Sequence, residues 1–312
     1  MTRIWFFGTP YLAARVLEDL LDSKHFEIPF IVTNPDKPFG RSWELRGSPV
    51  KEIALKHEIR ILQPEKIRGN TLFLDELRAF DCDYFIVVAY GKILPLELLE
   101  IPKKMCINVH GSTLPKYRWA SPIQAALLNG ENETGVTIME MSEGMDEGDI
   151  LKVRSIPINE HETSESLFEK FSNISGPTLI QTLLELEHGG ITPLPQDHTL
   201  ATYCKKIEKE DGLLDWSKTA LEIYHMWQAY TPWPGIYTIY EGKRLLLEIT
   251  NYEWEITNFW KVGQVLKLQD WRCGITCSEW ILTLEQVKLE WKKSQSIKDF
   301  VNGNQKFIWT QL

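Results

Sequence analysis

The chain of 312 residues has a formal net charge of −9; 43% of its residues are hydrophobic and 25% are charged. This length suggests one large domain or two ordinary ones, and the composition is that of a soluble globular protein. The apolar runs are too short to span a bilayer, the N-terminus lacks a signal-peptide pattern, and the negative charge argues against a general nucleic-acid binder.

The five cysteines are odd in number, and no pair has Cys-x-x-Cys spacing. This pattern predicts neither a disulfide framework nor a metal site, so we expect a cytoplasmic protein that binds no metal and no membrane. Residues 204–312 hold 14 basic and 14 acidic residues, which places the whole acidic excess in the rest of the chain. A polyanionic partner would therefore meet less repulsion in the C-terminal part.

Short β-branched or aromatic runs alternate with amphipathic stretches in the first half of the chain. Strands are predicted at residues 3–7, 28–33, 84–89, 107–110 and 136–141, and helices from residue 12, at 50–56 and at 164–186. Strand–helix alternation of this kind predicts a doubly wound α/β domain.

A Gly- and Pro-containing segment, residues 189–203, breaks this alternation and is predicted to be a linker. It is followed by a helical stretch and then by five short strand-like runs separated by turn signals. The helix is expected at residues 220–228, and the strands at 235–240, 244–250, 263–268, 274–277 and 280–287. Such spacing predicts a small β-barrel.

Asn108 and His110 form the strongest local signal for chemistry. Residues i and i+2 of a strand point to the same side, so both project from one face at the carboxyl end of a predicted buried strand. Ligands of open α/β sheets bind at such ends. An amide that stabilises an oxyanion beside an imidazole that moves a proton suits acyl transfer. The alternative is a structural histidine at a strand end.

A loop rich in glycine and carboxylates follows the strand predicted at residues 136–141. One of its carboxylates could reach His110 and orient the ring, and spacing alone does not choose between Asp146 and Asp149. An ordinary acidic turn is the alternative. The first strand ends in Gly8-Thr9-Pro10 rather than in Gly-x-Gly-x-x-Gly, so a dinucleotide cofactor is not indicated.

Several motifs together resemble folate-dependent formyltransferases, and most closely the branch of that family that acts on methionyl-tRNA. The resemblance covers nearly the whole chain. The segments that carry it are Asn108-Val109-His110-Gly111-Ser112-Thr113-Leu114-Pro115 with Arg118, Gly135–Met139 with Gly144-Met145-Asp146, Gly8-Thr9-Pro10, Val87–Gly91, Lys209-Glu210-Asp211-Gly212 and Pro232-Trp233-Pro234.

The resemblance implies an enzyme in which Asn108, His110 and Asp146 are catalytic and 10-formyltetrahydrofolate is the co-substrate. Tyr90, Gly91, Ser112, Thr113, Leu114 and Pro115 would line the folate site, and Arg41 and Lys206 would contact tRNA. The implied fold is a Rossmann-like catalytic domain at 1–188, the linker at 189–203 and an OB-like barrel at 204–312 that carries the tRNA. We expect a monomer.

The sequence departs from the family pattern at four places. Trp119 stands where the family has glycine, the 42–46 segment is less basic than usual, and Thr113 and Glu147 replace Leu and Thr. An indole beside a folate pocket could block binding.

Tryptophan is unusually frequent, with 12 residues, and Trp119, Trp280 and Trp291 fall where relatives tend to have glycine. Two explanations stay open. Either these are real tryptophans on a rearranged surface, or the source decodes one stop codon, TGA, as glycine where this sequence has tryptophan.

Three functions are therefore weighed. The first is formyl transfer to methionyl-tRNA for translation initiation. The second is the same chemistry on an amino sugar or another small amine, such as a purine precursor. The third is a catalytically dead homologue that binds tRNA or folate.

Overall fold

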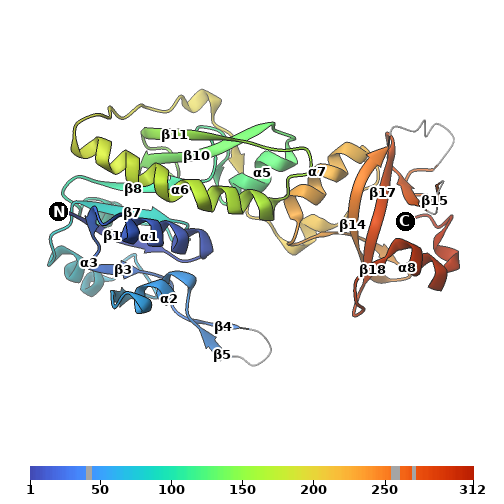
Figure 1. The fold of residues 1–312 in the computed structure, drawn as a ribbon, viewed down its shortest axis with the longest axis horizontal. Helices are drawn as coiled ribbons and strands as arrows, with labels where there is room; N and C mark the ends of the chain where they lie inside the picture. The colour runs from blue at the N-terminus through green and yellow to red at the C-terminus, as the bar shows by residue number, and fades with distance from the viewer. Residues whose placement is uncertain (40–43, 254–260, 269–271) are drawn as a thin grey trace. The chain divides into compact units, whose positions relative to one another are not determined.

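The computed structural model describes residues 1–39, 44–253, 261–268 and 272–312, which form two compact units (Figure 1). The first unit comprises residues 1–122, 133–157 and 168–204, and the second comprises 123–132, 158–167 and 205–312. Residues 189–203 belong by their contacts to the first unit. The domain limits drawn from the sequence stay a prediction.

Unit 1 is built on one large sheet with strand order β11-β10-β8-β7-β1-β3-β6, and β2 pairs with β1 at its margin. The strands are β1 (Thr2–Gly8), β2 (Phe26–Glu27), β3 (Phe30–Val32), β6 (Arg60–Leu62), β7 (Tyr84–Val88), β8 (Met105–His110), β10 (Glu133–Glu140) and β11 (Ile150–Pro157). Strands β6, β3, β1, β7 and β8 are parallel to one another, whereas β10 is antiparallel to both β8 and β11. The strand order reverses between β1 and β7, which is where ligands bind in doubly wound sheets.

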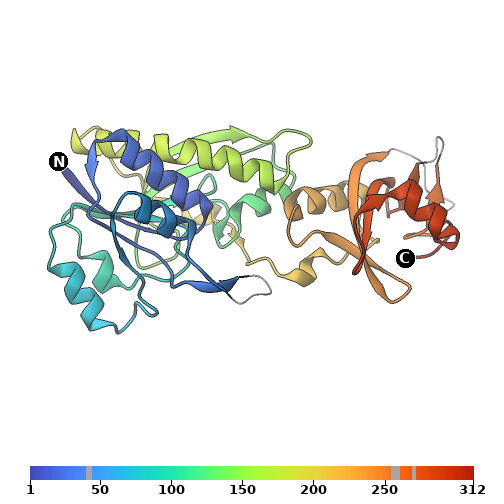
Figure 2. The same cartoon turned by 60° about the horizontal axis from the view of Figure 1, so that its bottom comes forward.

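The helices of unit 1 cover both faces of this sheet. They are α1 (Tyr11–Ser23), α2 (Pro49–Lys56), α3 (Thr71–Arg78), α4 (Leu96–Leu99) and α6 (Ser164–Glu187), whose first four residues count with unit 2. Helix α5 (Pro122–Leu128) belongs to unit 2 except for its first residue. Alternate residues of the strands, such as Trp5 and Phe85, form one buried cluster with apolar residues of α3 and α4. Helices α1 and α6 lie side by side, as Figure 2 shows, and Gly176 of α6 packs against Asp19 of α1.

Two smaller strand pairs flank the large sheet. Strand β4 (Lys37–Phe39) pairs with β5 (Glu44–Arg46), and β9 (Arg118–Trp119) pairs in parallel with β12 (Tyr203–Cys204). The second pair joins the segment after β8 to the end of unit 1.

Unit 2 contains an antiparallel sheet with strand order β13-β14-β17-β16-β15, to which β18 adds by pairing with β17. Its elements are α7 (Ala220–Tyr230), β13 (Ile236–Tyr240), β14 (Lys243–Glu253), β15 (Val265–Lys267), β16 (Cys273–Thr276), β17 (Ile281–Leu289), β18 (Gln295–Ser296) and α8 (Ile297–Gly303). Apolar residues of the sheet alternate inward and pack on α8, whose Phe300 meets Phe307 and Tyr240 edge to face.

The fold class predicted from the sequence, a Rossmann-like doubly wound α/β domain with a C-terminal OB-like β-barrel domain, is confirmed, and the sheet of the C-terminal domain is antiparallel. Each predicted strand and helix has a counterpart within a few residues of its expected bounds. The pattern did not reveal the antiparallel direction of β10, because burial on both faces gives the same apolar run in either direction.

Candidate active site

Strand β8 brings Asn108 and His110 to one side of the sheet at its carboxyl end. Its neighbours are β7 on one edge, where Val87 pairs with Asn108, and β10 on the other, where Thr137 pairs with His110. Strand β8 is an inner strand of the sheet, so its carboxyl end is flanked by a neighbouring strand on each side. His110 is only 5% exposed, whereas Asn108 is half-buried.

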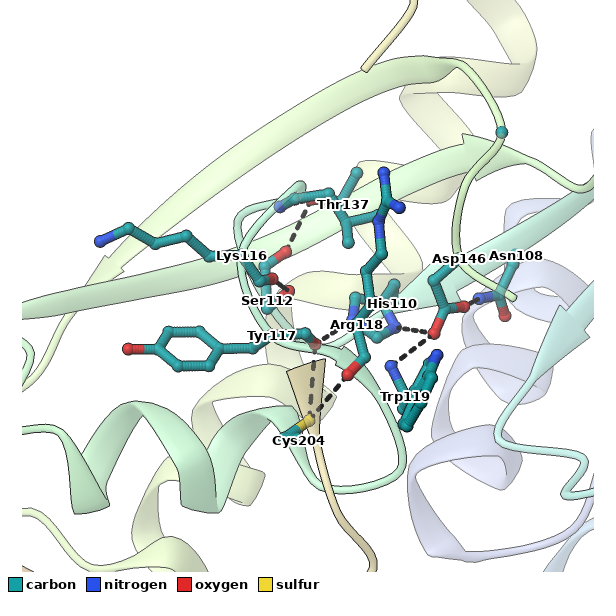
Figure 3. A network of polar contacts seen from close by, with 12 residues as sticks. Asn108, His110, Ser112, Lys116, Tyr117, Arg118, Trp119, Thr137, Asp146 and Cys204 are labelled. Carbon is teal, nitrogen blue, oxygen red and sulfur yellow. Dashed lines mark hydrogen bonds and ion pairs between the residues drawn. The ribbon is translucent and has the colours of Figure 1, made fainter. Parts of the chain in front are cut away.

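The Asp146 carboxylate lies against both of these residues, as Figure 3 shows. Asn108 Nδ2 lies 3.4 Å from Asp146 Oδ1, and His110 Nδ1 lies 3.7 Å from Asp146 Oδ2. The backbone N–H of Trp119 donates to Oδ2 at 2.9 Å. Two N–H donors and the Nδ1 side of the His110 ring thus surround one carboxylate.

The loop carrying Asp146 distinguishes it from the second candidate carboxylate. Asp146 has φ 57°, a left-handed conformation that Asp tolerates better than most residues. The Asp149 backbone carbonyl accepts from Glu140 N–H at 2.9 Å, which ties that residue to the end of β10. The structure therefore brings Asp146 to the His110 ring, which spacing alone could not decide.

Both nitrogens of the His110 ring face oxygen acceptors. Nε2 lies 2.9 Å from the Tyr117 carbonyl oxygen, and Nδ1 faces the Asp146 carboxylate. A carbonyl oxygen only accepts, so Nε2 must carry a proton.

The loop after β8, residues 111–117, is held by side chains that turn inward. Thr137 Oγ1 donates to the Ser112 carbonyl at 2.6 Å and accepts from Leu114 N–H at 3.1 Å. Ser112 Oγ donates to the Lys116 carbonyl at 2.6 Å. Ser112 and Leu114 are buried, while Thr113 and Pro115 are partly exposed. Of these four predicted folate-site residues, Ser112 and Leu114 support the loop, so mainly Thr113 and Pro115 remain accessible to a ligand.

Tyr90 and Gly91 lie after the carboxyl end of β7, next to β8. The Asn34 side-chain amide, located just beyond β3, donates to the Tyr90 carbonyl at 2.9 Å and to Thr9 Oγ1 at 3.0 Å. It thereby joins three strand ends at the point where the strand order reverses. Gly91 has φ 75°, and a Cβ there would meet nothing within 4 Å.

The Tyr90 side chain is buried, and its hydroxyl has no hydrogen-bond partner among the described residues. Burial raises the pKa of this phenol, which keeps it protonated and able to donate.

A buried polar network behind the Asp146 loop was not found from the sequence. Arg118 is fully buried, and its Nη2 and Nε donate to Gln196 Oε1 at 2.8 and 3.3 Å. Gln196 Nε2 in turn donates to the carbonyls of Asp146 at 2.9 Å and Gly148 at 2.7 Å. Glu147 lies 3.5 Å from Arg118 Nη1 and offsets its charge.

Gln196 belongs to the segment predicted as a linker, residues 189–203. In the structure this segment packs on unit 1: it bridges β11 through Ile150 and Leu194 and ends in β12. In the sequence, the one feature that could have indicated a role for Gln196 is its position as a glutamine in a segment rich in proline and glycine.

Cys204 at the end of β12 supports the same loop. Its Sγ donates to the Arg118 carbonyl at 3.0 Å, and burial raises the pKa of the thiol. The thiol therefore stays protonated and acts as a donor rather than as a nucleophile.

The two residues predicted to contact tRNA are not part of this cluster. Arg41 lies outside the described residues, and Lys206 is an exposed residue of unit 2. Within the described ranges, no group of three or more His, Cys, Asp or Glu could hold a metal ion. None of the helices described is long and apolar enough to cross a membrane.

Comparison with known proteins agrees with the resemblance seen in the motifs. The family model described as formyl transferase matches residues 2–183, and the model described as formyl transferase, C-terminal domain, matches residues 206–305. Together with the strand-end geometry, these matches define the class: the chain is a formyl-transferring enzyme with a Rossmann-like catalytic half. It belongs to the methionyl-tRNA formyltransferase family, as the curated relatives show.

The methionyl-tRNA formyltransferase of Caldicellulosiruptor saccharolyticus is 42% identical over 303 residues, covering 96% of this chain and 96% of the relative. That of Lachnospira eligens is 40% identical over 307 residues, covering 97% of each. Among solved structures, the sugar 3N-formyl transferase WlaRD matches with a TM-score of 0.66 at 19% identity, over 94% of this chain and 99% of that one. At this identity the match shows a shared fold alone.

Proposed function

We propose that this enzyme transfers the formyl group of 10-formyltetrahydrofolate to the amino group of methionyl-tRNA. The observation that carries the proposal is the Asp146 carboxylate held between Asn108, His110 and a backbone N–H at the carboxyl end of β8. The curated relatives, which are similar over almost their whole length, bear the name of this activity.

The cluster offers a route for the proton that acyl transfer releases. As the amine nitrogen bonds to the formyl carbon and the bond from that carbon to the folate nitrogen breaks, the amine loses a proton and the folate nitrogen gains one. The 3.7 Å between His110 Nδ1 and Asp146 Oδ2 exceeds a direct hydrogen bond, so a substrate N–H can reach the carboxylate. Asp146 would accept that proton, and His110 would stabilise the carboxylate.

Asn108 supplies the electrostatic part of the reaction. A side-chain amide has two N–H donors, of which one points to Asp146. The second can donate to the formyl oxygen as negative charge develops there, a contribution of about 10²–10³ in rate for one such donor.

For the folate, we propose a site bordered by Tyr90, Gly91, Thr113 and Pro115, with Ser112 and Leu114 supporting it. The open space over Gly91 and the unpartnered Tyr90 hydroxyl favour a ligand beside the end of β7. 10-Formyltetrahydrofolate supplies the formyl group there.

For tRNA, we propose contacts by Arg41 and the exposed Lys206, with a catalytic domain at 1–188 and a tRNA-carrying domain at 204–312. The balanced charge of the C-terminal part favours such a partner. A monomeric state and a cytoplasmic location stay predictions, and light scattering of the purified enzyme tests the first.

A formyl-transfer assay separates the three functions weighed from the sequence. The enzyme is incubated with 10-formyltetrahydrofolate and, in parallel, with charged initiator tRNA, an amino sugar nucleotide and a free amine. We expect formylation of the aminoacyl group. Transfer only to small amines would support the second function, and tRNA binding without turnover the third. The His110→Ala variant should bind both substrates, remain folded and lose transfer.

A further inference from the structure

The tryptophans that the structure describes fall into two groups with different backbone conformations. Four occupy the left-handed region, with φ of 86° at Trp119, 65° at Trp280, 63° at Trp291 and 71° at Trp309. The other four that the structure describes, Trp5, Trp216, Trp227 and Trp233, are not among its positive-φ residues. Positive φ brings Cβ against the backbone, and for a bulky residue it is an outlier.

Burial separates the groups less cleanly, because Trp233 is 55% exposed and Trp280 is only partly exposed. Trp5 and Trp216 are core residues, 0% and 6% exposed, as expected for a large apolar ring. Trp119, Trp291 and Trp309 are 48%, 89% and 58% exposed. The strained backbone at these three positions is therefore not offset by burial of the indole.

The turn at Trp309 shows which residue the backbone requires. Thr310 N–H donates to the Phe307 carbonyl at 3.1 Å, and between them Ile308 has φ −63° and ψ 133°. With φ 71° at Trp309, this is a type II turn, whose third position needs positive φ and favours glycine.

The other two positive-φ tryptophans of unit 2, Trp280 and Trp291, lie in tight turns at the two ends of β17. At Trp291, Lys292 N–H donates to the Leu289 carbonyl at 2.9 Å and closes a turn directly after the strand. Trp280 is the last residue before the strand, and its carbonyl accepts from Cys277 N–H at 3.1 Å. Glycine enters such positions without steric cost.

Trp119 differs from the other three because its backbone takes part in the candidate active site. Its N–H donates to Asp146, while its neighbour Arg118 anchors the loop from behind. The backbone conformation at Trp119 is thus fixed by the candidate active site, although the indole itself is half exposed beside Tyr203, with ring centroids 5.0 Å apart. Figure 3 shows the indole next to the Asp146–Asn108 contact.

We propose that positions 119, 280, 291 and 309 are glycine in the protein as its own cell makes it, each encoded by UGA. One residue type recurs at four separate positions that favour glycine, which points to one common cause rather than four unrelated replacements. UGA is a codon whose meaning differs between genetic codes. A code that assigns it to glycine, translated by a code that assigns it to tryptophan, produces this pattern.

The proposal also concerns the active site, and this part rests on the proposed function. Glycine at position 119 keeps the N–H that Asp146 accepts and removes the indole beside the catalytic cluster. The chain with glycine is therefore the form expected to admit folate fully, and the chain with tryptophan an impaired form of the same enzyme.

The direct test is to read the gene and the protein. We expect TGA at codons 119, 280, 291 and 309, and TGG at codons 5, 216, 227 and 233. Peptide mass spectrometry of protein isolated from the source cells should show glycine at the first four positions and tryptophan at the others. TGG codons at the first four, or tryptophan in those peptides, would overturn the proposal. Neither measurement depends on catalytic activity, so it stands apart from the proposed function.

A stability comparison tests the physical premise by itself. Trp291→Gly and Trp291→Ala both remove the exposed indole, but only glycine relieves the positive φ. We expect the unfolding constant of the glycine variant to be about 5-fold lower than that of the alanine variant. Equal stability of the two would refute the requirement for glycine at this turn.

The same pair at the site, Trp119→Gly and Trp119→Ala, gives the functional counterpart. The glycine variant should bind folate most tightly, as judged by KM, because it alone removes both the indole and the strain. A glycine variant with the same KM as the tryptophan chain would exclude the effect on the folate site, while leaving the codon test to decide residue identity.

Discussion

Two regions of unit 1 outside the parallel strands differ in burial and in the contacts that hold them. Around Asp146, backbone and side-chain groups are buried and tied to each other by Arg118 and Gln196. The pair of strands β4 and β5 carries exposed side chains at Glu44–Arg46; Arg46 forms an ion pair with Glu52, and Asp36, just before β4, forms one with Lys51. Proton transfer, which we propose for Asp146, needs fixed geometry, whereas the tRNA contact that we propose for Arg41, between β4 and β5 in sequence, would need accessible groups.

The largest expected effect comes from removing the charge at the centre of the buried region. Asp146→Asn keeps the shape of the side chain and can still accept from the Trp119 N–H, but it cannot take up the amine proton. We expect kcat for formyl transfer to fall about 10³-fold, within the range for a general base. Single-turnover assays check this, with thermal unfolding as the control for folding. A loss below 10-fold would remove Asp146 from the catalytic role.

The next effect should come from Gln196, which touches no substrate in our proposal. Gln196→Met removes both the acceptor for Arg118 and the donor to the Asp146 and Gly148 carbonyls. Displacement of the Asp146 loop should lower kcat by about 10²-fold and leave KM for both substrates little changed.

Gln196→Glu is the matched control, because it keeps an acceptor for Arg118 and loses only the donor. We expect it to be more stable than Gln196→Met but equally slow. If Gln196→Glu were fully active, the hydrogen bonds to the two carbonyls would have no positioning role.

The sequence predicted the strands and the catalytic side chains of this site better than the polar contacts that hold the Asp146 loop. Apolar runs located β7 and β8, and period-two alternation placed Asn108 and His110 on one face. The choice of Asp146 over Asp149 came from family resemblance, since a loop conformation with φ 57° leaves no periodic signal.

Gln196 was missed because its partner Arg118 lies 78 residues away in sequence, and only the folded chain brings them together. The hydrogen-bonded turns that place Trp291 and Trp309 at positive φ were likewise visible only in the structure. Long-range polar contacts and backbone angles are thus the part that local patterns do not encode.

The next smaller effect concerns the free energy of unfolding rather than the reaction rate. Thr137→Val replaces the buried hydroxyl that serves both Ser112 and Leu114 with a methyl group. Leaving a buried carbonyl and N–H without partners costs about 1–3 kcal/mol. Thr137→Ser, which keeps the hydroxyl, should cost less. Urea unfolding measures both, and equal losses would show that the methyl contact matters rather than the hydrogen bonds.

The smallest effect is expected at the ion pair beside β4, where Asp36 meets Lys51. The pKa of Asp36 is lowered by a hydrogen bond from Gln63, at 2.8 Å, and by the Lys51 ammonium, at 2.7 Å. A folded-state pKa below the unfolded value of about 3.9 means that the stabilisation is complete above that value. It is lost as the pH falls through the folded pKa.

Asp36→Asn should therefore destabilise the enzyme by only ~0–1 kcal/mol at neutral pH, as for other surface pairs, and the difference should vanish in acid. Unfolding followed between pH 7 and pH 2 tests this. If Asp36→Asn lowered the unfolding free energy as much as Thr137→Val does, the contacts beside β4 would stabilise the fold as strongly as the buried contacts do. The contrast between the two regions would then be wrong.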